Sequence, residues 1–293
     1  MKIPGRRRCW YLLSWLAVAC SGARSSPPRA PSPLPTFPVS QPPVPVAPTA
    51  GASSFKYASG TVRYRISRNA AIESASPDSQ THREISTNIT NELLTLEPVD
   101  GAMNFTALID TSATTTQGQI GSVQSVQLPS QISGSFTDSS LTIKSESVGG
   151  KCNAVSSMLA TDLRNLLIAF PEQLSTGVSW KDSADVNGCQ AGVPTSAHTT
   201  RSYIVSEATF YGGRPVLAIL RTDTIRAKGE GGLQQHRVSI DATGTGTALY
   251  YLDTGTGRVV RLTIDQILDL GVTASARRSQ FKQNSKQEFQ IVP

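Results

Sequence analysis

The fold class follows from residues 203–224, which read YIVSEATFYGGRPVLAILRTDT. Apolar and polar side chains alternate on both sides of Tyr211-Gly212-Gly213, and paired glycines between alternating runs are typical of a tight β-hairpin. The alternation predicts two strands, each with one face buried. Similar alternation recurs at residues 62–66, 103–109, 141–143, 260–264 and 281–291. Short turn segments such as Asp100-Gly101 separate these runs, so we predict an antiparallel meander.

One segment departs from this period of two. Between residues 153 and 169, and up to Pro171, apolar side chains recur every three or four residues, at Val155, Leu159, Leu163, Leu166 and Phe170. This spacing predicts one amphipathic helix over about 153–169, with its apolar stripe on the concave face of the sheet and Asn165 facing solvent. The predicted fold class is therefore α+β, mainly antiparallel β: a curved sheet or half-barrel with one covering helix.

The N-terminus predicts export. Three arginines at positions 6–8 precede a short apolar run, which ends in Leu16-Ala17-Val18-Ala19-Cys20. The run is well short of the roughly 20 apolar residues that cross a bilayer, so we interpret residues 1–19 as a cleaved signal peptide. Its end resembles the lipobox of bacterial lipoproteins, which implies acylation of Cys20 (palmitate) and, with Ser21 next, sorting to the outer membrane. The alternative is ordinary cleavage after Ala19, which would leave a free thiol on a secreted protein.

Residues 20–54 are predicted to hold the lipidated cysteine and a proline-rich linker. Pro, Ser, Ala and Val dominate this segment, a composition typical of an extended spacer, although a proline-rich recognition motif has the same composition. Residues 55–293 lack a second linker and are predicted to form a single β-rich domain. The formal charge of +6 falls by four, to +2, without Lys2 and the three signal arginines, so nucleic-acid binding is not expected.

The remaining cysteines, Cys152 and Cys189, are predicted to form a disulfide in an oxidising compartment. The bridge would close a loop of about 37 residues and contribute roughly 3 to 4 kcal/mol to stability. A metal site is not predicted, because the three histidines, His82, His198 and His236, are scattered along the chain.

Two short motifs suggest an alternative enzymatic function. Asp110 lies in Ile-Asp-Thr-Ser and Asp253 in Leu-Asp-Thr-Gly-Thr, which resemble the paired loops of aspartic proteases, where two carboxylates share a proton. Ser112 stands where that family has glycine, and Asp, Thr and Gly are also common in turns at strand ends. We therefore predict no enzymatic activity and no cofactor, and keep the pair Asp110 and Asp253 as the protease alternative.

The helix between strands, the Gly177-x-x-Trp180 sequence and the Asp-x-x-x-Gly hairpin at Asp253 resemble secreted bacterial lipoproteins with a half-barrel of the lipoprotein-carrier (LolA) and LppX-like fold. The resemblance implies a curved sheet with an apolar groove and supplies no catalytic residue. We expect a cell-envelope lipoprotein, held at the outer membrane by its lipid and facing the periplasm, that binds an apolar or lipid-like ligand or an envelope protein. The alternative is a structural or assembly lipoprotein whose groove is filled by its own side chains.

Overall fold

A computed structural model of the protein describes residues 56–75, 81–116, 130–137, 140–144, 152–190, 193–233, 236–275 and 277–293. These residues form eleven strands and one helix. The first meander comprises β1 (Gly60–Ala75), β2 (Thr81–Val99), β3 (Ala102–Thr116), β4 (Ser130–Phe136) and β5 (Leu141–Lys144). After α1 (Ala154–Leu166), the second comprises β6 (Ser179–Gln190), β7 (Val193–Tyr211), β8 (Arg214–Leu233), β9 (His236–Asp253), β10 (Val259–Ala274) and β11 (Arg277–Val292). The predicted signal peptide, Cys20 and the predicted linker lie outside the described residues.

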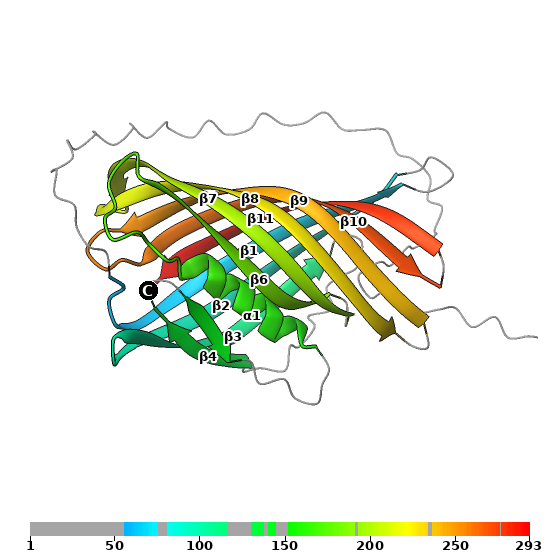
Figure 1. Ribbon diagram of the computed structural model, residues 1–293, viewed down its shortest axis with the longest axis horizontal. Coiled ribbons are helices and arrows are strands. Elements are labelled where there is room, and N and C mark those ends of the chain that lie inside the picture. The colour runs from blue at the N-terminus through cyan, green and yellow to red at the C-terminus, as the bar shows by residue number, and fades with distance from the viewer. Residues whose placement is uncertain are drawn as a thin grey trace, which may run out of the picture. The chain divides into compact units, whose positions relative to one another are not determined.

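All the described strands belong to one antiparallel sheet in the order β5-β4-β3-β2-β1-β11-β10-β9-β8-β7-β6. The first and last strands pair in its middle, with Ile66 opposite Phe289 and both side chains fully buried. This pairing joins the two meanders and leaves β5 and β6 as the edges. The sheet curves into a half-barrel with α1 in front of its concave side (Figure 1). The predicted fold class is confirmed.

The hairpin between β7 and β8 confirms the turn predicted from its two glycines. Tyr211 lies opposite Arg214 in the register, and Gly212 and Gly213 both have positive φ, at 56° and 78°. This left-handed backbone is accessible to glycine without steric cost, which is why the pair occupies the turn. The same requirement places Gly101, with φ of 80°, in the turn between β2 and β3.

Helix α1 is shorter than predicted. It starts at Asn153, whose side chain accepts hydrogen bonds from the N–H groups of Val155 (2.9 Å) and Ser156 (3.2 Å). It ends at Leu166 rather than near 169, because Leu167 adopts an extended conformation (φ −101°, ψ 91°). The chain then continues along the interior, where Leu167 and Ile168 remain buried. Because Leu167 and Ile168 are apolar as well, the apolar pattern continues past the end of the helix, and the predicted helix was too long.

The helix covers the opening between the two edges of the sheet. It contacts β6 at one edge and β3 and β4 toward the other. The predicted stripe is buried, with Leu159, Leu163 and Leu166 each at most 2% exposed. Each such leucine contributes about 1.5 to 3 kcal/mol of transfer free energy. The helix is therefore part of the core and fills one half of the groove with its own side chains.

Aromatic residues close the core beside the C-terminal end of α1. Tyr57 packs on Phe136 and Phe170, with ring centroids 5.2 and 5.5 Å apart. Its hydroxyl accepts a hydrogen bond from the N–H of Ile168 at 2.7 Å, and so fixes the chain just after the helix. Stacking continues from Trp180 to Tyr203, with centroids 4.8 Å apart. This end of the half-barrel is filled by the protein itself.

The predicted disulfide between Cys152 and Cys189 is formed, with the two Cα atoms 5.3 Å apart. Cys189 lies within β6, because that strand runs on to Gln190. The bridge therefore ties the start of α1 to an edge strand of the sheet.

Side chains on the convex face are mostly polar. Thr222, Thr247, Asp265 and Lys286 form a row across neighbouring strands and are all exposed. This is the alternation of a sheet with one face on the core and one in water. Within the described part of the chain, no helix has the length and apolarity needed to cross a membrane.

Candidate functional site

Polar side chains on the concave face form a first buried network that holds α1 against β1 and β2. Asp162 of the helix forms an ion pair with Arg68 of β1. Arg68 also donates to the hydroxyl of Thr90 at 2.8 Å and lies 3.6 Å from the carboxylate of Glu92. Asp162 and Glu92 are at most 2% exposed, so the helix brings a second carboxylate to a single buried cation.

Glu92 is the titratable group most affected by this arrangement. Burial, followed by the charge of Asp162 and a hydrogen bond to it, raises the pKa of Glu92 well above the ordinary 4.5, although Arg68 opposes the shift. Because one guanidinium cannot fully compensate two buried carboxylates, the site favours the protonated form of Glu92.

A second buried network joins the helix to β8 and β9 through Arg221, which is 2% exposed. Its guanidinium donates to Asn165 (3.0 Å), to Asp223 (2.8 Å) and to the hydroxyl of Tyr250. Burial alone would lower the pKa of Arg221, but Tyr250 and Asp223 raise it above its usual range. Arg221 therefore stays charged inside the core.

The expectation that Asn165 faces solvent was wrong, since it is 9% exposed and bonded to Arg221. The apolar stripe predicts burial on one side of the helix only. Because α1 lies between two sheet edges, its buried surface is wider than this stripe and includes polar positions.

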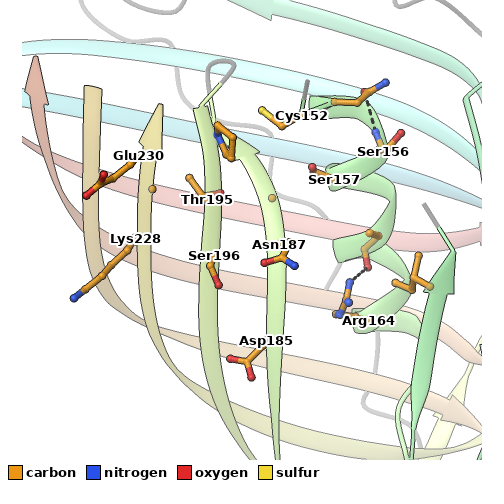
Figure 2. Close-up of a pocket in the computed structure, with 16 residues that line it drawn as sticks. Cys152, Ser156, Ser157, Arg164, Asp185, Asn187, Thr195, Ser196, Lys228 and Glu230 are labelled. Atoms are coloured by element: carbon orange, nitrogen blue, oxygen red, sulfur yellow. Dashed lines mark hydrogen bonds between the residues drawn. The ribbon is translucent and has the colours of Figure 1, made fainter. Parts of the chain in front are cut away.

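A cavity of about 710 Å3 lies between the N-terminal half of α1 and strands β6, β7 and β8 (Figure 2). Gly188, Thr195 and Gly229 are neighbours in the register and form its floor, where the side chain of Thr195 lies against both glycines. A side chain at Gly229 would collide with Thr195 and the carbonyl of Pro194, so this flat floor requires glycine there.

The opposite wall of the cavity is one side of the helix. Ser156, Ser157, Ala160 and Arg164 line it, and Ile143 of β5 lies beyond them. Cys152 lines the same cavity, so the disulfide lies at its boundary. The lining combines apolar surface with hydroxyl groups and four charged side chains, those of Arg164, Lys228, Asp185 and Glu230.

Arg164 is the charged side chain that the helix contributes to this cavity. It donates to the carbonyl of Ala160 at 3.3 Å, which places the guanidinium along the lining (Figure 2). Burial and the nearby positive charge of Arg201 lower the pKa of Arg164. Arg201 itself is neutralised by Asp182, to which it donates two hydrogen bonds of 2.7 and 3.0 Å.

The acidic residues at the cavity rim have partners elsewhere. Asp185 is 2.8 Å from His198, and Glu230 accepts a hydrogen bond from Arg237 at 2.8 Å. The side chain of Glu230 points away from α1 (Figure 2). Among the described residues, no carboxylate lies within ion-pair distance of Arg164. The sequence contains no motif that marks this arginine, because its surroundings come from strands far along the chain.

A second hollow, of about 810 Å3, lies on the convex face. Exposed side chains such as Thr222, Thr247 and Lys286 line it. It has no covering element among the described residues.

The structure does not bring Asp110 and Asp253 together. They lie on β3 and β9, which are separated in the sheet by β2, β1, β11 and β10. Asp110 is 3.4 Å from Arg63, and Asp253 is 3.6 Å from Arg214. Asp253 also accepts the N–H groups of Gly255 (2.7 Å) and Thr256 (3.2 Å), as in the strand-end turn that composition suggests. Asp110 lies within a strand instead, beside a β-bulge.

Within the residues that the structure describes, no cluster of three or more His, Cys, Asp or Glu side chains could hold a metal ion. His198 lies on the exposed side of β7, paired with Asp185.

No family model matches the chain, and no curated protein matches it. Solved structures that match include Neisserial surface protein A (8% identity, 80% of this chain, 99% of that chain, TM-score 0.22). They also include the outer membrane protein OpdK of Pseudomonas aeruginosa (6% identity, 81% and 100%, TM-score 0.22) and a mutant porin of Rh. blastica (8%, 80% and 99%, TM-score 0.22). Similarity at this level carries no inference about this chain. The resemblance to LolA and LppX-like lipoproteins stays a prediction.

Proposed function

We propose that the protein is a cell-envelope lipoprotein whose half-barrel binds a lipid-like ligand between α1 and the strands β6, β7 and β8. The observation that carries the proposal is the cavity of about 710 Å3. Small-molecule sites in proteins typically occupy roughly 300 to 1,000 Å3, so this cavity has the size of a ligand site.

The lining favours an amphiphile over a purely apolar ligand. Ile143, Ala160 and Pro194 offer apolar surface, whereas Ser156 and Thr195 offer hydroxyl groups. Such a surface accommodates a chain of methylene groups and hydrogen-bonds a polar end. Elsewhere among the described residues, leucines, aromatic residues and the two buried polar networks occupy the concave face, which favours ligand binding in this part of the groove.

The main alternative is a structural lipoprotein in which the cavity holds only water. Native mass spectrometry of the protein purified from its host, followed by lipid extraction, distinguishes the two functions. We expect a bound species that disappears on extraction. A single mass that equals the polypeptide with its covalent modifications, before and after extraction, would favour the structural function.

A cavity-filling substitution connects the bound species to this site. Ser156→Phe places a large side chain in the cavity from the helix wall and should abolish ligand retention. Thr161→Phe introduces the same side chain on the exposed face of α1 and serves as the control. Equal ligand retention by both variants would place the bound species elsewhere.

Anchoring is tested separately. The lipobox-like sequence predicts that Cys20→Ala releases the protein from the membrane fraction and abolishes labelling by a fatty-acid analogue. The β-rich domain should keep its wild-type melting temperature, because residues 20–54 are predicted to be a spacer. Absence of label on the wild-type protein would refute the lipoprotein assignment.

A further inference from the structure

We infer that the ligand of this cavity is anionic, and that its carboxylate or phosphate group binds the guanidinium of Arg164. The inference rests on the proposed function and adds the charge class of the ligand. It concerns the cavity between α1 and strands β6 to β8. The sequence alone does not predict the charge of a ligand bound there.

The first step is the charge balance around the cavity. Arg201 is held by Asp182 through two hydrogen bonds of 2.7 and 3.0 Å. In the described part of the chain, Arg164 has no corresponding carboxylate; its guanidinium donates to the carbonyl of Ala160 at 3.3 Å. Among the described residues, Arg164 is therefore a partly buried cation at the cavity wall without a carboxylate partner, whereas Lys228, the other cation of the lining, is exposed to water.

The second step is that the protein does not compensate this charge from the rim. Asp185 and Glu230 are engaged at 2.8 Å by His198 and Arg237 respectively. Both acids occupy outward positions of their strands and are exposed to water, which screens them from the cavity.

The third step is the cost of leaving the cation unpaired. Burial and Arg201 both lower the pKa of Arg164, which means that its surroundings disfavour the charged form. An arginine remains protonated in proteins, so this cost persists until an anion compensates it. The guanidinium also presents several N–H donors in one plane, which suits bidentate binding of a carboxylate or phosphate.

The position of Arg164 determines how the ligand lies. Its guanidinium bonds back to the carbonyl of Ala160, so the side chain lies along the helix wall that also includes Ser157. A head group at Arg164 would therefore leave the apolar chain on the flat glycine-containing floor, beside Ile143. The matching ligand is an acidic amphiphile such as a fatty acid or a phospholipid.

Competition binding with the full chain tests this inference. The delipidated protein is loaded with the neutral fluorescent probe N-phenyl-1-naphthylamine, which is then displaced by dodecanoate, dodecyl phosphate, dodecanol or inorganic phosphate. We expect dodecanoate and dodecyl phosphate to bind about tenfold or more tightly than dodecanol, since a hydrogen-bonded charge supports a difference of this size. Inorganic phosphate should bind more weakly than dodecyl phosphate; equal binding of the two would overturn the amphiphile assignment.

Substitutions of Arg164 test whether this residue causes the preference for anionic ligands. Arg164→Gln should remove the advantage of the two anions and leave dodecanol binding unchanged, whereas Arg164→Lys should retain part of it. Arg226→Gln makes the same change of charge at an exposed position of β8 and should behave as wild type. If dodecanol and dodecanoate bind wild type equally, or if Arg164→Gln weakens both alike, the inference fails while the proposed function stands. If no amphiphile displaces the probe, the proposed function fails.

Discussion

Replacing Glu92 by glutamine should change how the stability of the domain depends on pH. Glu92 is 2% exposed beside Asp162 and Arg68, and burial raises its pKa well above 4.5. Glutamine has the shape of the protonated acid and can still donate a hydrogen bond to Asp162. Glu92→Gln therefore reproduces the neutral form of the network at every pH.

The direction in which stability changes with pH follows from the number of protons that the folded and unfolded states bind. Above about pH 4.3 the unfolded chain releases the Glu92 proton, whereas the folded protein keeps it until the raised pKa is reached. The folded state then binds one more proton, so wild-type stability falls as pH rises, by up to about 1.4 kcal/mol per pH unit from this residue. The loss is complete once pH exceeds the folded pKa, and Glu92→Gln should not show it.

Urea unfolding of the soluble domain between pH 4.5 and 8 measures this difference. The two proteins should have similar free energies of unfolding near pH 4.5, and the variant should become more stable as pH rises. Glu97→Gln, the same substitution at an exposed position of β2, should follow the wild-type profile. Parallel profiles for wild type and Glu92→Gln would refute the view that the pKa of Glu92 is raised in the folded protein.

Three further predictions concern the docking of α1. Leu163→Ala should cost roughly 2 to 5 kcal/mol, because it leaves a cavity under the helix, and should lower the melting temperature by roughly 4 to 20 °C. Asn165→Ala should cost about 1 to 3 kcal/mol in a urea titration, because the buried Arg221 loses an acceptor; wild-type stability would mean that water replaces it freely. Serine at both Cys152 and Cys189 should cost roughly 3 to 4 kcal/mol, and reduction of the wild-type disulfide should have the same effect.

Local pattern was enough to predict most of the secondary structure. The strands around Gly212 and Gly213 and the apolar stripe centred on Leu163 depend on near neighbours in sequence, so their periodicity was sufficient. Residues 220 and 221 are an exception, since Leu220 is 46% exposed and Arg221 is 2% exposed. Hydropathy would exchange the two, so the burial of Arg221 was not predicted.

Features that depend on distant segments could not be predicted. The pairing of β1 with β11 joins residues more than two hundred positions apart, such as Arg63 and Val292, and no local signal specifies that register. The network around Arg68 likewise joins β1 and β2 to a helix more than sixty positions away. The candidate site is visible only in the three-dimensional structure, because the docking of α1 on β6, β7 and β8 brings together residues that are not neighbours in sequence.

The cavity between α1 and the sheet is the centre of this account, and photo-crosslinking in living cells tests it most directly. A photoreactive phenylalanine analogue is placed at Ser157, which lines the cavity, or at Thr161, which is exposed on the same helix. Irradiation followed by mass spectrometry should reveal an adduct of lipid-like mass at position 157 and none at position 161. Adducts of equal yield at both positions, or none at position 157, would contradict the claim that this cavity binds a ligand.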